Sequence, residues 1–218
     1  MTRIWLIRHG ESESNAGRSS SVPGSSPLTA LGRRQAEQIA RGLPDAPALI
    51  VTSPFVRARQ TAQPMISRFP RAEGQEWPVQ EFTYLGELHG RTMTPEEREP
   101  HVQAYWKRSD PDDASGGGES FAGLLRRVTD CLSRLASARP GPVAVFTHGY
   151  FMRAVVWSLL TGVSAPDGQQ MRDFRSFALS YLIPNGSVVE LRAAGRDAPV
   201  LLGGSTIHLP AALAGNPY

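Results

Sequence analysis

The sequence holds a single cysteine and contains no long apolar run. Because Cys131 has no partner in the chain, no internal disulfide can form, and we expect a reducing compartment. No segment reaches the roughly 20 apolar residues that a membrane-spanning helix needs. Strand-forming residues follow the first methionine almost at once, so cleavage of a signal peptide would remove them. These features favour a soluble, cytoplasmic protein that does not bind membranes.

Lysine is also scarce, since Lys107 is the only one, and arginine carries nearly all of the positive charge. The formal net charge is only +3, and no run of basic residues interleaved with aromatic residues is present, which argues against binding of nucleic acid. His89, His101 and His208 lack the spacing to one another or to carboxylates that metal ligands require. We therefore expect no metal and no other cofactor.

The chain has 218 residues, enough for one domain with a full hydrophobic core. Apolar segments typical of strands alternate with segments of helical period. This alternation predicts an α/β fold, a three-layer α/β/α sandwich with a mostly parallel central sheet. Residues 194–218 show no periodicity. The sequence thus predicts a single domain over residues 1–218, with an irregular tail from residue 194.

Within this fold the apolar pattern locates the main elements. Strands are expected at residues 4–7, 48–52, 77–79 and 143–146. Helices are expected behind an N-cap at Thr29, from Ser53 and Pro54, from Ser120, and over residues 152–160. A hairpin is expected where Pro184, Asn185 and Gly186 separate residues 177–183 from 188–191. Irregular segments are expected at residues 16–27, 81–98 and 110–118.

Two of these strands end in a histidine followed by a glycine. His9 and Gly10 follow the first strand, and His148 and Gly149 follow the strand at residues 143–146. In open α/β sheets the ligand crevice lies beyond the carboxyl ends of the strands, and a glycine lets a bound group approach the backbone closely. A single histidine there would be an ordinary packed residue. Two of them in parallel settings favour phosphoryl transfer through a phosphohistidine.

Two arginines complete the predicted phosphate site. A phosphate monoester carries about two negative charges near neutral pH, and arginine can bind two of its oxygens with one planar fork. Arg8 directly precedes His9, and Arg57 lies in the first turn of a predicted helix, where backbone N–H groups also favour anions. We therefore expect these arginines and the two histidines to converge on one anion.

Five blocks of sequence carry a family resemblance, and they follow one another in order between residues 3 and 190. The blocks are Leu6-Ile7-Arg8-His9-Gly10-Glu11-Ser12 with Asn15; Pro27-Leu28-Thr29 with Gly32 and Gln35-Ala36; Ser53-Pro54-Phe55-Val56-Arg57-Ala58 with Gln60-Thr61-Ala62; Gly118-Glu119-Ser120 with Arg127-Val128; and Thr147-His148-Gly149. A chain with these blocks resembles the histidine phosphatase superfamily, in its phosphoglycerate-mutase-like branch.

The resemblance implies a role for each site residue. His9 would be the nucleophile that accepts the phosphoryl group on a ring nitrogen. Arg8, Arg57 and His148 would hold the phosphoryl oxygens and stabilise the charge that develops on them. No metal is implied.

Three further residues are expected to assist at the substrate-binding site. Asn15 would add a neutral donor, although formation of a turn is an alternative for this residue. Gly149 would offer its backbone N–H to the phosphate. Glu119 would orient the arginines or histidines, or else it is a carboxylate favoured by the dipole at a helix N-terminus.

The general acid has two candidates. Leu85-Gly86-Glu87 has the Leu-x-Glu spacing of the mutase-like members, whereas Glu81-Phe82-Thr83 resembles the Glu-aromatic-Thr segment of other phosphatases in the family. The family's Gly-x-Trp-Glu-Gly is absent after Glu87, so the alignment does not decide between them. We favour Glu81 as proton donor, because a strand end fixes a side chain better than a position within a loop.

The sequence therefore predicts a phosphomonoester hydrolase that works through a phosphohistidine on His9, with a small phosphorylated metabolite as its substrate. The segment between the acid candidates and Gly118 is moderate in length, so water would reach the site, which favours hydrolysis. A cofactor-dependent phosphoglycerate mutase is one alternative. The other, from a different class, is an inactive member that binds phosphorylated ligands.

Overall fold

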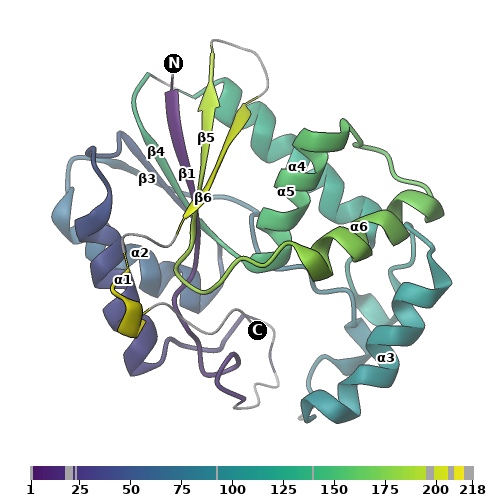
Figure 1. The fold of residues 1–218 in the computed structure, drawn as a ribbon. Helices are drawn as coiled ribbons and strands as arrows, with labels where there is room; N and C mark the ends of the chain where they lie inside the picture. Colours follow the sequence, from purple (N-terminus) through teal and green to yellow (C-terminus); the bar gives the residue numbers. More distant parts are fainter. Residues whose placement is uncertain are drawn as a thin grey trace.

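The computed structural model describes residues 2–17, 22, 24–91, 93–138, 140–194, 199–205 and 209–213. Its centre is a six-stranded sheet in the order β3-β2-β4-β1-β5-β6 (Figure 1). β1 (Thr2–Arg8), β2 (Leu49–Thr52), β3 (Glu73–Glu76) and β4 (Val143–Thr147) pair in parallel, whereas β5 (Val188–Ala193) pairs antiparallel with β1 and with β6 (Val200–Ser205). The predicted mostly parallel sheet is confirmed.

Helices cover both faces of this sheet, as Figure 1 shows. α1 (Ala30–Gly42) and α2 (Val56–Arg68) pack on one face, and α4 (Phe121–Ala136), α5 (Gly149–Thr161) and α6 (Gly168–Ser180) on the other. The alternation along β1 explains the three layers, because Trp5 and Ile7 pack against α1 and α2 while Ile4 and Leu6 face α4 and α5. The predicted three-layer sandwich is therefore confirmed.

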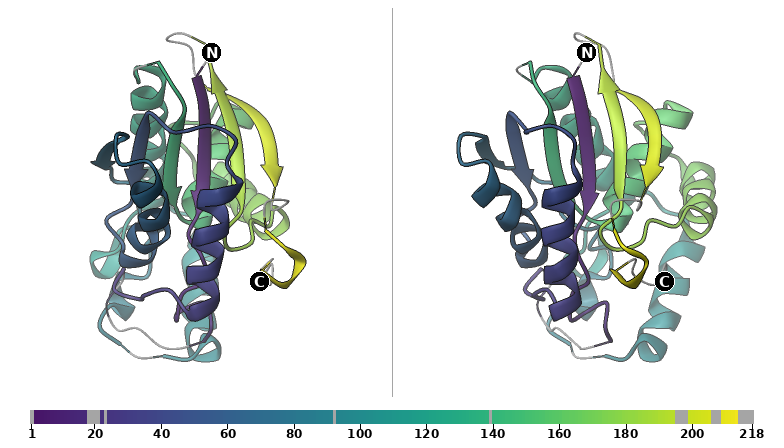
Figure 2. Two further views of the ribbon diagram at one scale, coloured as in Figure 1. Left: turned by 90° about the vertical axis from the view of Figure 1, so that its left-hand side faces the viewer. Right: turned by 60° about the vertical axis from the view of Figure 1, so that its left-hand side comes forward.

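α3 (Pro95–Arg108) lies outside these layers, beyond the carboxyl ends of the parallel strands (Figure 2). This helix was not expected, since residues 81–98 were predicted to be irregular. Thr94 and Glu97 form a reciprocal capping box around Pro95, which fixes the start of the helix. The segment is mostly polar, so its apolar period is weak. The cap was the signal in the sequence that could have identified it.

Two predicted strands are wrong. The third strand is β3, at residues 73–76 rather than 77–79, and it was missed because all four of its residues are exposed at the sheet edge. No hairpin precedes β5, because residues 177–180 belong to α6, which begins at a capping box between Asp167 and Gln170. Pro184-Asn185-Gly186 is instead the turn that leads from α6 into β5.

Other boundaries differ in ways that matter for the site or the sheet. Ser53 does not cap α2, which begins at Val56, and its hydroxyl instead accepts from the Phe55 N–H at 3.2 Å. The tail predicted to be irregular contains β6, whose strand pattern is hidden by Gly203 and Gly204. His208 and the end of the tail at residues 214–218 lie outside the described residues.

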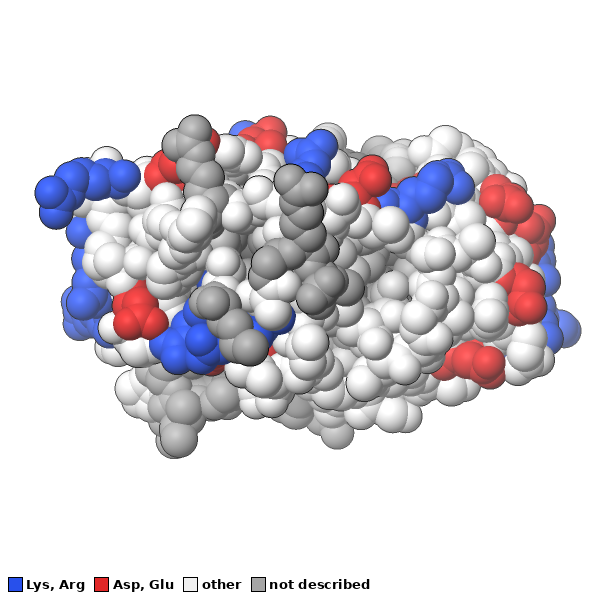
Figure 3. All heavy atoms as spheres, turned by 90° about the horizontal axis from the view of Figure 1, so that it is seen from above, with Lys and Arg blue, Asp and Glu red and all other residues white. Residues whose placement is uncertain are grey.

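Among the described residues, no helix combines the length and the apolar character that a membrane span would need. At the end of the molecule where the parallel strands begin, acidic and basic side chains are interspersed among uncharged ones (Figure 3). The site that the sequence predicts lies at the other end, where β1 and β4 terminate.

Candidate active site

The two strand-end histidines lie side by side. β1 and β4 are adjacent and parallel, with Arg8 opposite Thr147, so His9 and His148 leave the sheet at the same level. Their ring centroids are 5.0 Å apart, and both side chains are buried. The structure therefore brings together the two imidazoles that lie far apart in the sequence.

The hydrogen bonds of His9 define its tautomer. Its Nδ1 lies 2.7 Å from the Gly10 carbonyl oxygen, which can only accept, so Nδ1 carries the proton. Its Nε2 accepts a hydrogen bond from Arg57 Nε at 3.0 Å. Burial, reinforced by the charges of Arg57 and Arg8, holds the pKa of His9 well below its usual range. The ring is therefore neutral near pH 7, with its lone pair on Nε2.

His148 is the N-cap residue of α5, and its Nε2 lies 2.8 Å from Ser53 Oγ. Its Nδ1 is buried and has no hydrogen-bond partner in the described parts of the chain. Burial lowers the pKa of His148 well below its usual range, and the charge of Arg57 lowers it further. The position at a helix N-terminus suits a group that binds an anion.

Two guanidinium groups lie beside the histidines. Arg8, at the end of β1, donates to the Ile183 carbonyl oxygen, and its Nε is buried without a partner among the described residues. Burial lowers the pKa of Arg8 to about 10, so it stays positively charged near neutral pH. Arg57 lies in the first turn of α2, with its guanidinium carbon 5.0 Å from the centre of the Phe55 ring. Two positive charges therefore face one buried centre.

Of the two candidate acids, only Glu81 lies in this cluster. Its Oε1 accepts hydrogen bonds from the Tyr150 N–H at 2.9 Å and from the Phe82 N–H at 3.1 Å. Burial has the largest effect on the pKa of Arg8 and of Arg57 and lowers both. The negative charge of Glu81 acts in the opposite direction and raises both pKa values, because Glu81 lies close to the two guanidinium groups. Glu87 is exposed on the short helix Gly86–Leu88 and lies 3.6 Å from a ring nitrogen of His101.

The three assisting residues differ in their surroundings. Asn15 closes a turn, because its Oδ1 accepts from the N–H and the hydroxyl of Ser12 and from Asn185 Nδ2. Gly149 begins α5, where an added Cβ would lie 3.4 Å from Arg8 Nε. Glu119 uses both carboxylate oxygens on Arg127, each at 2.6 Å, rather than on Arg8 or Arg57.

Sequence reasoning missed several groups that build the site. Thr61 Oγ1 accepts from the Gly10 N–H at 3.1 Å and donates to the Arg57 carbonyl oxygen at 2.6 Å, so it ties α2 to the His9 loop. Thr61 belonged to a block of the family resemblance, which was the available signal. The Tyr150 N–H and the Ile183 carbonyl are main-chain groups, and no residue type reveals them.

A hollow of about 170 Å³ opens beside the cluster, and Arg57 and Glu81 line it. Its walls mix polar and apolar side chains, and two of the polar ones, His89 and Arg98, are exposed to solvent. The apolar lining consists of Val22, Phe55, Phe82, Leu85 and Leu88, with Tyr84 beside them. The hollow therefore places apolar contacts and charged groups, Arg57 and Glu81 among them, around one solvent-accessible space.

Comparison with known proteins agrees with this arrangement. The family model of the histidine phosphatase superfamily (branch 1) matches residues 4–198. A metal-independent phosphoserine phosphatase of Arabidopsis thaliana is 32% identical over 170 residues, covering 76% of this chain and 71% of that protein. A probable phosphoglycerate mutase GpmB of Yersinia enterocolitica is 30% identical over 172 residues, covering 73% of this chain and 75% of that protein.

A solved structure extends the likeness to the fold. The mycobacterial glucosyl-3-phosphoglycerate phosphatase superposes with a TM-score of 0.65 at 25% identity, and the match covers 87% of this chain and 89% of that one. The family match spans most of the chain and includes both strand-end histidines. The resemblance predicted from the five sequence blocks is confirmed, and the chain belongs to the histidine phosphatase superfamily, branch 1.

Proposed function

We propose that this protein is a phosphomonoester hydrolase in which His9 Nε2 accepts the phosphoryl group. The observation that carries the proposal is the state of His9, a neutral imidazole whose lone pair faces the Arg57 guanidinium. An imidazole in this state is a nucleophile at neutral pH, and the neighbouring cations stabilise the charge on the transferred group. The family membership and the relatives named as phosphatases support the same activity.

In the first step the phosphate of the substrate binds Arg8, Arg57 and His148, which face the same buried centre as His9. His9 Nε2 then attacks phosphorus, so a P–N bond forms while the bond from phosphorus to the leaving oxygen breaks. Glu81 donates a proton to that oxygen. Both backbone donors reach Glu81 Oε1, and Oε2 has no hydrogen-bond donor in the described part of the chain, so Oε2 is the oxygen placed to pass the proton.

The second step returns the enzyme to its starting state. Water attacks phosphorus in line with the P–N bond, and the ionised Glu81 accepts a proton from that water. The P–N bond breaks, the electron pair returns to His9 Nε2, and inorganic phosphate is released. Because Glu81 serves as acid and then as base, no additional titratable group is required.

The hollow is where we place the organic part of the substrate. Its volume suits a small phosphorylated metabolite, and Arg98 lines it together with Arg57, Glu81 and several apolar side chains. Arg98 forms no ion pair with any described residue, so a second anionic group on the substrate would reach an uncompensated charge. The preferred substrate class is a phosphate ester that also bears a carboxylate.

A phosphoglycerate mutase is the second candidate, since one relative carries the name of a probable phosphoglycerate mutase. Hydrolysis is favoured because exposed side chains, His89 and Arg98, line the hollow, so water has access to the phosphohistidine. Interconversion of phosphoglycerates that depends on a bisphosphoglycerate primer would support the mutase, and its absence would remove it. An inactive ligand-binding protein is disfavoured, because Arg8, His9, Arg57 and His148 converge.

The state of Cys131 bears on the compartment in which the protein works. Cys131 is a free, buried thiol whose pKa burial raises to about 12, and it packs between the apolar residues of α4. A protein with one unpaired cysteine is suited to a reducing environment. We therefore propose that the protein works in the cytoplasm. We also propose that residues 1–218 form a single catalytic domain.

The experiment that tests the proposal is trapping of the intermediate. Enzyme mixed with a radiolabelled phosphate ester and quenched in alkali should retain label in a bond that acid breaks, as expected for a P–N linkage. His9→Asn should abolish both the label and the turnover, whereas His101→Asn, at a half-buried histidine that does not line the hollow, should retain both. Turnover by His9→Asn at the wild-type rate would overturn the assignment.

A further inference from the structure

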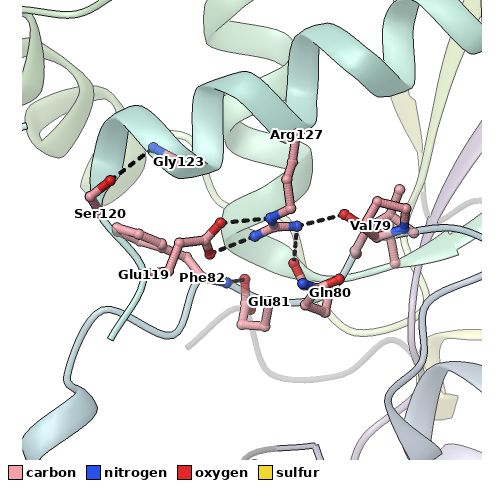
Figure 4. Close-up of polar contacts among 10 residues, drawn as sticks. Val79, Gln80, Glu81, Phe82, Glu119, Ser120, Gly123 and Arg127 are labelled. Atoms are coloured by element: carbon pink, nitrogen blue, oxygen red, sulfur yellow. Dashed lines mark hydrogen bonds and ion pairs between the residues drawn. The ribbon is translucent and has the colours of Figure 1, made fainter. Parts of the chain in front are cut away.

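The segment that carries Glu81 belongs to no helix or strand, yet side chains hold its backbone. Arg127 donates through one terminal nitrogen to the Pro78 carbonyl oxygen at 2.8 Å and to the Gln80 carbonyl oxygen at 3.0 Å (Figure 4). The carbonyl between them, that of Val79, accepts from Thr147 Oγ1 at 2.6 Å. Three successive carbonyls before Glu81 are therefore fixed by side chains from α4 and β4.

Arg127 is itself held in place. Glu119 binds it through two parallel hydrogen bonds of 2.6 Å, and its guanidinium carbon lies 5.3 Å from the centre of the Phe151 ring. The Glu119 N–H also donates to the Thr83 carbonyl oxygen at 3.1 Å. The Glu119–Arg127 pair thus holds the chain on both sides of Glu81, as Figure 4 shows for the side before it.

Neither member of the pair lines the hollow, and neither contacts His9. A bidentate arginine–carboxylate pair with little solvent exposure is more rigid than a pair of flexible surface chains. A general acid has to be held within about 0.5 Å of its productive position. A rigid pair at the base of the segment meets that requirement without touching the substrate.

We propose that Glu119 and Arg127 are positioning residues for proton transfer, which fix the Glu81 carboxylate against the leaving oxygen. This inference rests on the proposed role of Glu81 as the acid. Their effect should depend on the leaving group, because a good leaving group departs without a proton and a poor one does not. A merely structural role would lower the turnover of all substrates alike.

The test uses a series of aryl phosphates from dinitrophenyl phosphate to unsubstituted phenyl phosphate. General acid catalysis contributes about 100-fold to 10,000-fold, so Arg127→Met should lower kcat/KM by about 30-fold for phenyl phosphate and by less than about threefold for dinitrophenyl phosphate. The matched control is Arg126→Met, at the exposed neighbour on α4, which should leave both values unchanged. Glu119→Gln, which keeps the shape of the side chain, should show the same selectivity as Arg127→Met.

Equal losses across the series in folded Arg127→Met and Glu119→Gln, or no loss in either, would overturn the inference. Glu81→Gln, measured on the same series, separates this failure from a failure of the proposed function. If Glu81→Gln is selective for poor leaving groups and the pair variants are not, the acid stands and the positioning role falls. If Glu81→Gln is not selective either, the assignment of the acid itself is wrong.

Discussion

Arg57 Nε donates a hydrogen bond to His9 Nε2 across 3.0 Å. The nitrogen that we propose as nucleophile is thus engaged by the group that we propose to bind the phosphate of the substrate. A phosphate dianion is a stronger acceptor for a guanidinium than a neutral imidazole is, so we expect substrate binding to draw the Arg57 fork away and release the lone pair. This one contact would then couple substrate binding to exposure of the proposed nucleophile.

Replacement of Arg57 by lysine should impair catalysis strongly. A lysine keeps the charge but loses the planar fork, and removal of such a transition-state contact lowers kcat by about 100-fold to 1,000-fold. Steady-state kinetics on an aryl phosphate measures this loss. Arg59→Lys, on the same helix at an exposed position paired with Glu76 at 3.4 Å, should behave as wild type. A loss under about threefold in Arg57→Lys would contradict the role of the guanidinium.

The two candidate acids can be separated by paired substitutions. Glu81→Gln should lower kcat by about 100-fold or more on an alkyl phosphate ester, because the leaving alkoxide then departs without a proton. Glu87→Gln should change kcat by less than about twofold, since that carboxylate is exposed and lies beside His101 rather than Arg57. Small and equal losses in the two variants would mean that neither residue is the acid.

Arg98 should distinguish substrates with and without a carboxylate. Phosphoserine and phosphoethanolamine differ in that group, and Arg98→Gln should raise KM about fivefold for phosphoserine alone, as expected for an exposed ion pair. Arg91→Gln, an exposed arginine of the same segment that does not line the hollow, is the control. If Arg98→Gln shifts KM equally for both esters, the hollow does not recognise a second anion through this residue.

The buried histidines should make folding stability depend on pH. Because the folded-state pKa values of His9 and His148 are depressed, the unfolded chain binds more protons below about pH 6.5, the ordinary histidine pKa. Above that pH the two neutral histidines do not lower the free energy of unfolding. Below it, the free energy of unfolding falls by about 1.4 kcal/mol per pH unit for each histidine.

Urea denaturation at a series of pH values below 7 measures this slope. His148→Asn should reduce it by about half of the two-histidine value, that is by about 1.4 kcal/mol per pH unit. An unchanged slope in His148→Asn would show that its imidazole titrates normally in the folded protein.

The contact between the His9 loop and α1 should not tolerate a side chain. A Cβ added at Gly32 would lie 2.0 Å from the Glu11 carbonyl oxygen, so Gly32→Ala forces two backbone segments apart. We expect a loss of about 3 kcal/mol or more in the free energy of unfolding. Gly74→Ala, on exposed β3 with nothing near the added Cβ, should change stability by less than about 1 kcal/mol. Equal effects of the two substitutions would contradict the close approach.

Buried strands and amphipathic helices were predictable because burial on one or both faces imposes a pattern. The run Ile4 to Ile7 is apolar throughout since helices cover both faces of β1, and its end located His9. α3 and β3 escaped prediction because they lie at edges, where few positions are buried and no period results. The end of β1 was therefore easier to identify than the segments that surround the hollow.

For the site, residue types indicated the charged groups but not the geometry that relates them. Arginine and histidine side chains bind phosphate and transfer phosphoryl groups, so their residue types indicated Arg8, His9, Arg57 and His148. The structure brings all four together. The choice between Glu81 and Glu87 depends on the Tyr150 N–H, a main-chain donor that exists only once α5 has formed. Interactions of this kind depend on tertiary structure, and because they use main-chain groups, the amino-acid type at the position does not indicate them.

The loop that bears His9 is completed by the turn that leads from α6 into β5. The Arg8 N–H donates to the Ser187 carbonyl oxygen at 2.9 Å, and the Arg8 guanidinium donates to the Ile183 carbonyl oxygen. Asn185 Nδ2 donates to the His9 carbonyl oxygen at 3.1 Å. During translation His9 therefore emerges from the ribosome long before the residues that clamp its backbone. A nascent polypeptide cannot close this loop until residues 183–187 have also emerged, so the site is completed well after β1 has been made.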